Sequence, residues 1–337
     1  MGVTVLSVLG GLVLLALGGE LLVRGAVRLA ERLGVSPLLI GLTVVGFGTS
    51  TPELVTSVQA ALVGSPGIAV GNIVGSNVLN ILVILGLAAL IWPLAVPPAA
   101  LRRDGVAVVA TAALLGLIGW LWTLDRLAGA LLIGLLGAYL YASWRQERTS
   151  EHPPGGHTAA FDKAEAHEGL DPALVPGAVR APGRPAHRAA DRVVPTLLAL
   201  GGLLLLVVGA RLLVGGSIDL ARELGISEGV IGLTVVALGT SMPELVTSVV
   251  AAVRRHTEVA LGNVLGSCVY NTLGIGGVTA LVAPTDVPDE MLRFDIPVMV
   301  GVSVLLLVLL YTRLALQRWE GALLLAGYAA YVWVLWP

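Results

Sequence analysis

Two glutamates lie in long apolar stretches of this sequence, where a carboxylate is costly to place. Glu53 lies in the segment GLTVVGFGTSTPELVTSV, and Glu244 lies in the segment GLTVVALGTSMPELVTSV. An ionisable side chain inside an apolar membrane helix is rare and usually serves a function. Two such carboxylates balance the charge of one divalent cation, of two monovalent cations or of two protons. The pair therefore predicts a cation site.

The two glutamates belong to a stretch that the chain contains twice. Residues 41–80 align with residues 232–271 without a gap, at an offset of 191, and 24 of the 40 positions are identical. Each copy ends in a second motif, GNIVGSNVLN in the first and GNVLGSCVYN in the second. Many transporters are built from two such repeats, with the substrate site between them. We therefore expect the two copies to form one shared site.

Each copy surrounds its glutamate with side chains that carry oxygen. Thr49 lies four residues before Glu53 and shares its helix face, and Ser50 lies three residues before it. In the following helix, Ser76 and Asn80 are also four residues apart. The second copy repeats these positions with Thr240, Ser241, Ser267 and Asn271.

Pro52 predicts a weak point in the helix beside the first glutamate. Proline has no N–H to donate to the carbonyl of Gly48, and its ring pushes against the preceding turn. A loosened carbonyl inside a membrane needs a partner, and a bound cation can supply one. Pro243 repeats this arrangement in the second copy.

The candidate ligands are all oxygens, which is the ligand type that hard cations require. Ca²⁺ takes about 6–8 oxygens in a flexible geometry, whereas Mg²⁺ prefers to keep its own water. The set therefore favours Ca²⁺ as a transported ion, with no cofactor. Each residue also has a simpler interpretation: serine and threonine in membrane helices often bond to their own backbone, and Asn80 or Asn271 could hold two helices together.

The helices that carry these motifs must cross a membrane. Hydrophobic residues make up 56% of the chain and charged residues only 12%, against about 25% in soluble proteins. Ten apolar runs are about 20 residues long, enough to span the bilayer core. They are residues 3–23, 36–63, 66–92, 104–123, 127–145, 193–213, 228–253, 258–283, 295–312 and 317–336. The sequence thus predicts an all-α membrane protein with ten transmembrane helices.

The ten runs fall into two five-helix repeats, residues 1–145 and 193–337, joined by a polar linker at 146–192. An odd number of helices in each repeat gives the repeats inverted topology. With both termini outside, 16 of the 20 lysines and arginines lie on the inner side, as the positive-inside rule requires. We therefore expect a cytoplasmic linker. The only partners indicated are the lipid bilayer and inorganic cations, because no basic groove suggests nucleic acid and no obligate protein partner is evident.

At these residues the chain resembles the cation/calcium antiporter superfamily, specifically its prokaryotic sodium/calcium exchanger branch. The motifs GTSTPELVTS with GNIVGSN, and GTSMPELVTS with GNVLGSC, look like that family's two alpha-repeats. The resemblance implies alternating access at a mid-membrane site in the plasma or inner membrane of a prokaryote, with the first helix of each repeat sliding over a fixed core.

The resemblance also implies a set of cation ligands. Glu53 and Glu244 would be the principal ligands, and backbone carbonyls near Gly46 and Ala237 would contribute to flanking sodium sites. The remaining members of the cluster would be Thr49, Thr240, Ser50, Ser241, Ser76, Ser267, Asn80 and Asn271.

Asn271 is a departure from some sodium-coupled relatives, which carry aspartate at this position. Asparagine also occurs here in proton-coupled relatives, although their motif around the glutamate usually differs from GTSxPE. We therefore predict exchange of Ca²⁺ for Na⁺, with exchange of Ca²⁺ for H⁺ as the alternative. A cation channel is less favoured, because alternately sealing halves give a channel no advantage. An enzyme is disfavoured because the spanning helices contain no histidine and no catalytic constellation.

Two further sets of charged residues have structural interpretations. Glu20 and Arg24 are four residues apart near a helix end, which predicts an ion pair within one helix. Asp104 and Asp295 match each other at the offset of 191 and lie near helix starts. We expect these two aspartates to cap their helices.

Overall fold

The computed structural model describes residues 1–32, 46–96, 98, 101–149, 190–255 and 257–336 of the chain. In this part, seven helices are long and apolar enough to cross a membrane, or eight if the bent pair Glu228–Thr240 and Met242–Val253 forms one span. The chain is thus a helical, multi-pass membrane protein. The predicted span at 36–63 begins outside the described residues, and the helix at the predicted span 317–336 is not among these seven or eight. The count of ten therefore remains a prediction.

The first half of the chain contributes one long helix, a broken helix and three further helical segments. In order, the elements are α1 (Gly2–Arg32), α3 (Gly46–Thr49), α4 (Thr51–Leu62), α5 (Pro66–Leu79), the π-helical turn η2 (Asn80–Ile84), α6 (Leu85–Ile91), β1 (Leu94–Ala95), the π-helical turn η3 (Leu101–Gly105), α8 (Val106–Leu121) and α9 (Arg126–Thr149).

The second half repeats the order of the main helices, but its short strand follows the fourth long segment instead of preceding it. Its elements are α11 (Ala190–Leu224), α12 (Glu228–Ile231), the π-helical turn η4 (Gly232–Val236), α13 (Ala237–Thr240), α14 (Met242–Val253), α15 (Thr257–Val269), the π-helical turn η5 (Tyr270–Ile275), α16 (Gly276–Val282), the π-helical turn η6 (Met291–Asp295), α17 (Ile296–Arg313), β2 (Ala315–Leu316) and α18 (Arg318–Leu335).

Several helices are longer than their apolar runs. Helix α1 has 31 residues and α11 has 35, against predicted runs at 3–23 and 193–213. The added residues are mostly alanine, leucine, arginine and glutamate, which are good helix formers and continue a helix beyond the bilayer core. Helices α9 and α11 also extend into both ends of the predicted linker, most of which lies outside the described residues.

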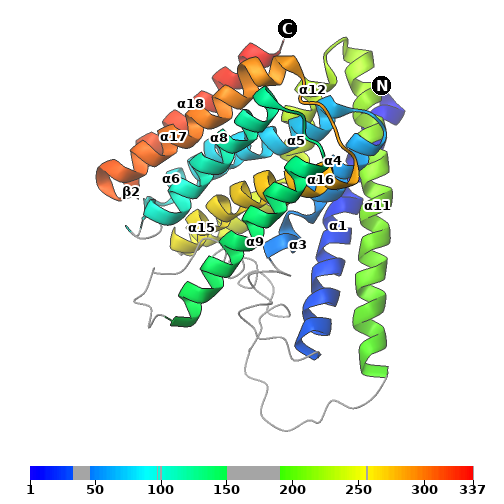
Figure 1. Ribbon diagram of the computed structural model, residues 1–337, viewed down its shortest axis with the longest axis horizontal. Coiled ribbons are helices and arrows are strands. Elements are labelled where there is room, and N and C mark those ends of the chain that lie inside the picture. The colour runs from blue at the N-terminus through cyan, green and yellow to red at the C-terminus, as the bar shows by residue number, and fades with distance from the viewer. Residues whose placement is uncertain (33–45, 97, 99–100, 150–189, 256, 337) are drawn as a thin grey trace.

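Helices α1 and α11 pack side by side along most of their length, at one edge of the molecule (Figure 1). Glycines spaced by seven residues line the contact on both helices. They are Gly11, Gly18 and Gly25 on α1, and Gly202, Gly209 and Gly216 on α11. A Cβ atom added at Gly202 would lie 2.4 Å from the backbone nitrogen of Leu22 and 2.6 Å from the carbonyl oxygen of Gly18. Small residues allow such close backbone contact in lipid, where packing replaces the hydrophobic driving force.

The helices at the centre of the molecule exchange partners between the two halves. Helix α4 packs on α5 and α14 packs on α15, within each half, whereas α6 packs on α18 and α9 packs on α16. The spans that contain α5 and α15 are mostly buried by the other helices. Short backbone contacts also join the two halves of the chain. Strand β1 pairs with β2 through Leu94 and Leu316, and Leu124 forms a bridge with Thr285.

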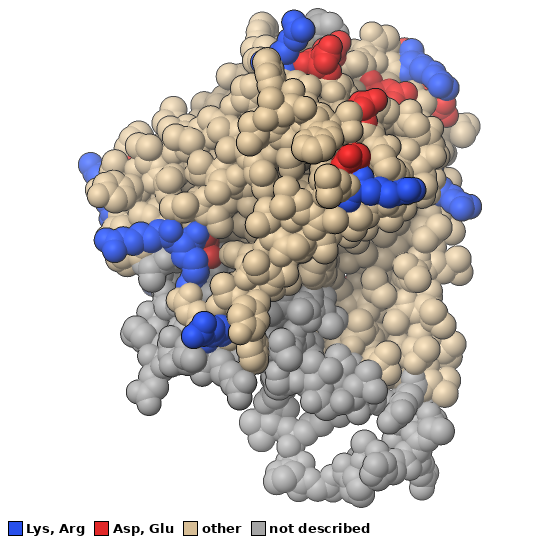
Figure 2. All heavy atoms as spheres, viewed as in Figure 1, with Lys and Arg blue, Asp and Glu red and all other residues tan. Residues whose placement is uncertain are grey.

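The surface agrees with a membrane environment. Uncharged side chains cover most of the face shown in Figure 2. Many large apolar side chains are exposed on the outer helices, including Leu204 on α11 and Trp333 on α18. The predicted ion pair within α1 is present, because Arg24 donates to the carboxylate of Glu20. Exposed apolar helices of this kind suit lipid as the surrounding solvent.

Candidate cation-binding site

The site is built around two helix breaks, one in each half of the chain. The break between α3 and α4 lies at Ser50, and the break between α13 and α14 lies at Ser241. Both serines have nearly the same backbone angles, with φ of −88° and −83° and ψ of 10°. The second break bends the helix by 52°. Each glutamate therefore lies in the first turn of a new helix, where the helix dipole stabilises a negative charge.

The two breaks face each other through crossed hydrogen bonds. Ser50 of the first half donates to Oε1 of Glu244 at 3.2 Å. Ser241 of the second half donates to Oε1 of Glu53 at 3.0 Å. Both glutamates are only 1% exposed. The structure thus places the two carboxylates in one buried cluster, rather than toward lipid, and each repeat completes the surroundings of the other repeat's glutamate.

Ser76 joins this cluster, and the turns η2 and η5, which carry Asn80 and Asn271, pack against the glutamate helices α14 and α4. The hydroxyl of Ser76 hydrogen-bonds with that of Ser241 at 3.1 Å. The π-helical turn η2 starts at Asn80, and η5 contains Asn271. Among the described residues, neither polar atom of the Asn80 side chain has a hydrogen-bond partner, and neither does Oδ1 of Asn271. Buried polar atoms normally have partners, so these oxygens are suited to an ion.

The other predicted ligands differ in how their hydroxyls are used. The hydroxyl of Thr49 is buried and has no hydrogen-bond partner among the described residues. The hydroxyl of Thr240 lies 3.0 Å from Oδ1 of Asn72 and 3.0 Å from the carbonyl of Val236. Ser267 donates to the carbonyl of Asn263, one turn earlier in its own helix, at 2.8 Å. Each of these oxygens keeps at least one lone pair with which it could bind a cation.

The two backbone candidates are less clearly available. The carbonyl oxygen of Ala237 accepts the N–H of Ser241 at 3.0 Å, and the Thr240 hydroxyl lies 3.4 Å from it. A carbonyl oxygen has two lone pairs, so this contact still allows a cation ligand. Gly46 forms the first residue of α3, at the edge of the described part of the chain. The ligand role of both residues remains a prediction.

Sequence reasoning missed two asparagines that hold the glutamate helices in place. Asn72 on α5 donates to the backbone carbonyl of Glu53 at 3.1 Å and to the hydroxyl of Ser57 at 2.9 Å. Asn263 on α15 makes the matching contacts to Glu244, at 3.3 Å, and to Ser248, at 2.8 Å. The glycine–asparagine pairs of both motifs suggest close packing alone. Ser57 and Ser248, each four residues after its glutamate, were a further sequence signal for these asparagine contacts.

We expect Asn72→Ala to destabilise the protein because it leaves the buried carbonyl of Glu53 without this donor. An unsatisfied buried polar group costs about 1–3 kcal/mol. The measurement is thermal unfolding of the purified protein in detergent, with Gln59→Ala on α4, at a partly exposed position, as the matched control. An unchanged unfolding temperature for Asn72→Ala would mean that the hydrogen bond from Asn72 to the carbonyl of Glu53 does not stabilise the protein.

The expected capping role of Asp104 and Asp295 is wrong. Asp104 is fully buried and accepts two hydrogen bonds from the guanidinium of Arg103, at 2.7 and 3.0 Å, and one from Tyr139 at 3.3 Å. Asp295 accepts from the hydroxyl of Tyr331 at 2.8 Å and makes no capping bond to α17. Side-chain partners thus take the place of the helix N–H groups: the neighbouring Arg103 and Tyr139 of α9 for Asp104, and Tyr331 of α18 for Asp295.

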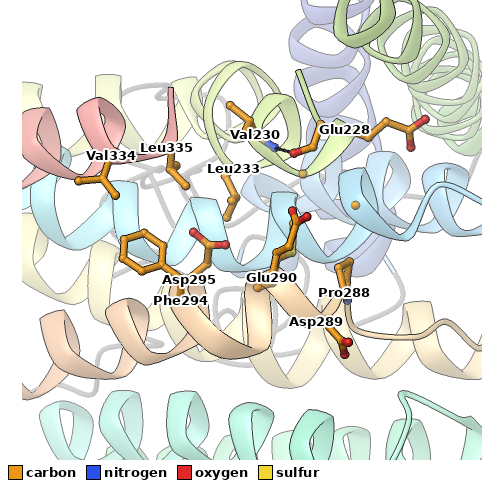
Figure 3. A pocket seen from close by; sticks show the side chains of 14 residues that line it. Glu228, Val230, Leu233, Pro288, Asp289, Glu290, Phe294, Asp295, Val334 and Leu335 are labelled. Atoms are coloured by element: carbon orange, nitrogen blue, oxygen red, sulfur yellow. Dashed lines mark hydrogen bonds between the residues drawn. The ribbon is translucent and has the colours of Figure 1, made fainter. Parts of the chain in front are cut away.

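A cavity of about 470 Å³ lies elsewhere, between the start of α12, the turn η6 and the end of α18 (Figure 3). Four acidic side chains line it: Glu228, Asp289, Glu290 and Asp295. Its lining includes none of the predicted ligands among the described residues. The cavity is therefore separate from the cluster around Glu53 and Glu244.

Comparisons with known proteins agree with the division of the chain into two repeats. A family model described as "Sodium/calcium exchanger protein" matches residues 3–145 and again residues 194–336. The sodium/calcium exchanger MaX1 of Methanosarcina acetivorans is 35% identical, with 99% of this chain and 98% of MaX1 aligned. The inner membrane protein YrbG of Escherichia coli is 32% identical over 97% of this chain and 94% of its own length.

A solved structure has the same overall arrangement. It is the sodium-calcium exchanger NCX_Mj soaked with zero Na⁺ and Ca²⁺, which is 31% identical and matches with a TM-score of 0.59. The match covers 99% of this chain and 99% of that one.

Proposed function

Because the chain belongs to the sodium/calcium exchanger protein family, we propose that it is a secondary active antiporter that exchanges Ca²⁺ for Na⁺ at the cluster around Glu53 and Glu244. The observation that carries this proposal is the pair of crossed hydrogen bonds, Ser50 to Glu244 and Ser241 to Glu53. They join two carboxylates from different repeats into one buried group, whose two negative charges require a compensating cation.

The exchange follows from charge balance in a buried site. Two carboxylates away from water are costly unless paired, so the cluster is stable when it holds one Ca²⁺ or at least two monovalent cations. An empty cluster would have to carry two buried charges through the conformational change. The protein therefore changes sides with one set of ions or the other, which couples the two fluxes without covalent chemistry or a cofactor.

The proposed movement uses the packing of the two long helices. Helices α1 and α11 are joined through their glycines and slide together over the remaining helices, which opens the cluster to each side in turn. We place ten spans in the membrane as two inverted repeats, with both termini outside and the linker 146–192 in the cytoplasm. The proposed ligands are the twelve residues named from the sequence, and a single chain suffices for transport.

The experiment that tests the proposal is an ion-swap assay with purified protein in liposomes. We expect uptake of radioactive Ca²⁺ when the liposomes are loaded with Na⁺ and diluted into Na⁺-free buffer. We expect little uptake when K⁺ replaces Na⁺ or when an ionophore removes the Na⁺ gradient. Absence of uptake with either Na⁺ or H⁺ opposed to Ca²⁺ would overturn the antiporter proposal.

The second candidate is an antiporter of Ca²⁺ and H⁺ at the same cluster. The observation that favours it is Asn271, which gives the cluster an amide where a carboxylate would help to bind Na⁺. The motif GTSxPE around both glutamates favours Na⁺. In the same assay, uptake driven by a pH gradient without Na⁺ would select the proton-coupled alternative, and single-channel currents would select a channel instead.

A further inference from the structure

The contacts of Asn77 break the symmetry between the two repeats beside the proposed site. Asn77 lies on α5 and is 3% exposed. Its Nδ2 donates to the hydroxyl of Thr272 at 2.9 Å and to the sulfur of Met299 at 3.5 Å. Its Oδ1 accepts a hydrogen bond from the side-chain Nδ2 of Asn271 at 3.5 Å. All three partners belong to the second half of the chain, so Asn77 connects the first repeat directly to a predicted cation ligand.

The corresponding positions of the other half contain none of these polar partners. At the offset of 191, Cys268 replaces Asn77, Ile81 replaces Thr272 and Val108 replaces Met299. All three replacements are buried. Asn80 corresponds to Asn271. The residue that corresponds to Asn77 in the other half is Cys268. A thiol is a poor hydrogen-bonding group compared with a carboxamide.

The contacts of Asn77 set the orientation of the Asn271 carboxamide. The Thr272 hydroxyl and the Met299 sulfur both serve as acceptors, so Asn77 directs its NH₂ group toward them and its carbonyl toward Asn271. A carbonyl oxygen can only accept, and Asn271 therefore turns its own NH₂ group toward Asn77. This leaves Oδ1 of Asn271 buried, without a hydrogen-bond partner among the described residues.

We propose that Asn77 is a positioning residue that acts through Asn271 and fixes its side-chain oxygen as a cation ligand. The proposal rests on the function proposed above and adds a residue to it. Asn80 has no corresponding partner, because neither of its polar side-chain atoms is hydrogen-bonded within the described part of the chain. The two amides are thus unequal ligands: Asn271 is oriented before the cation arrives, whereas Asn80 must be oriented on binding, which costs ordering entropy.

The test is a pair of double-mutant cycles that use cation affinity as the readout. Calorimetry on the purified full chain gives the Ca²⁺ affinity, and transport in liposomes gives the Ca²⁺ concentration for half-maximal rate and the maximal rate. We expect Asn77→Leu to weaken Ca²⁺ binding about threefold to tenfold, as for the loss of one hydrogen bond. The maximal rate should change much less than the affinity.

The two cycles separate a positioning role from a general structural one. Added to Asn271→Ala, the Asn77→Leu change should have no further effect on affinity, because the group that it positions is gone. Added to Asn80→Ala, it should retain its full effect. Non-additivity of this kind is expected only for residues that act through one another.

Three more variants keep the test decisive if Asn77→Leu folds poorly. Thr272→Val removes only the acceptor that orients Asn77, and it should weaken Ca²⁺ binding in the same direction. Asn77→Asp keeps an acceptor for Asn271 and should bind Ca²⁺ more tightly than Asn77→Leu. Cys268→Ala, the matched change in the other half, should leave the affinity unchanged.

Additive effects of Asn77→Leu and Asn271→Ala would overturn the positioning role and leave the proposed function intact. An equal loss of affinity in Cys268→Ala would overturn the role as well, because it would show that the symmetry break is irrelevant. If the unmodified protein binds no Ca²⁺, the proposed function is overturned instead. In that case the same cycles measured with Na⁺ still decide whether Asn77 acts through Asn271.

Discussion

Replacing Glu53 with glutamine is expected to abolish Ca²⁺ exchange while the protein remains folded, and Glu244→Gln should do the same. In the unmodified protein, the hydroxyl of Ser241 donates to Oε1 of Glu53 at 3.0 Å. Glutamine has the shape of glutamate and keeps an acceptor for this hydroxyl. It removes one of the two negative charges that offset a buried divalent cation. Breaking a buried charge pair in this way costs about 3–5 kcal/mol, which corresponds to at least about a hundredfold loss of Ca²⁺ affinity.

The measurement for these variants is Na⁺-driven Ca²⁺ uptake in liposomes, together with thermal unfolding in detergent. Glu320→Gln is the matched control, because Glu320 is also buried but lies far along the chain, in the capping box of α18. Glutamine can replace glutamate in a capping box, so this control should transport normally. Exchange at the full rate by Glu53→Gln or Glu244→Gln would show that these carboxylates do not bind the transported ion.

The second large effect is expected from Gly202→Val in the contact between α1 and α11. The added Cβ would lie 2.4 Å from the nitrogen of Leu22 and 2.6 Å from the carbonyl of Gly18, and these are backbone atoms that cannot rotate away. The two helices must then separate. Overpacking commonly costs about 1–3 kcal/mol, and more where backbone is the obstacle. We expect a lower unfolding temperature and loss of transport.

Gly201→Val provides a closely matched control for this substitution. Gly201 precedes Gly202 in α11, but an added Cβ there would meet nothing within 4 Å. Both variants carry the same change in helix propensity, so their difference measures the helix contact alone. Equal unfolding temperatures and transport rates for the two variants would show that the glycine contact is unimportant.

The sequence predicts the main features of the site because the duplicated motifs carry them directly. The structure brings Glu53 and Glu244 together in one buried cluster, with Ser50, Ser241 and Ser76 bonded to it. Proline predicts the broken helices, and the breaks fall two residues before each proline, at Ser50 and Ser241. The lengths of α1 and α11 were less predictable, because polar residues beyond an apolar run can continue a helix or end it.

The remaining differences depend on tertiary contacts that a repeat does not reveal. The hydrogen bond from Asn77 to Thr272 is one of these, because Cys268 and Ile81 stand at the matching positions of the repeats. Asp104 and Asp295 bind side chains from other elements instead of their helix ends. Sequence spacing fixes which face a side chain occupies, but its rotamer and partner depend on residues distant in the chain.

The crossed serine–glutamate bonds also bear on how the two copies diverge over evolutionary time. Ser50 donates to Glu244 and Ser241 donates to Glu53, so a mutation in one copy disturbs a partner encoded 194 or 188 codons away. A change in either of these serines or glutamates therefore acts on both copies at once. Val63 and its counterpart Arg254 make no such bond to the cluster among the described contacts, and the two copies differ in residue type there.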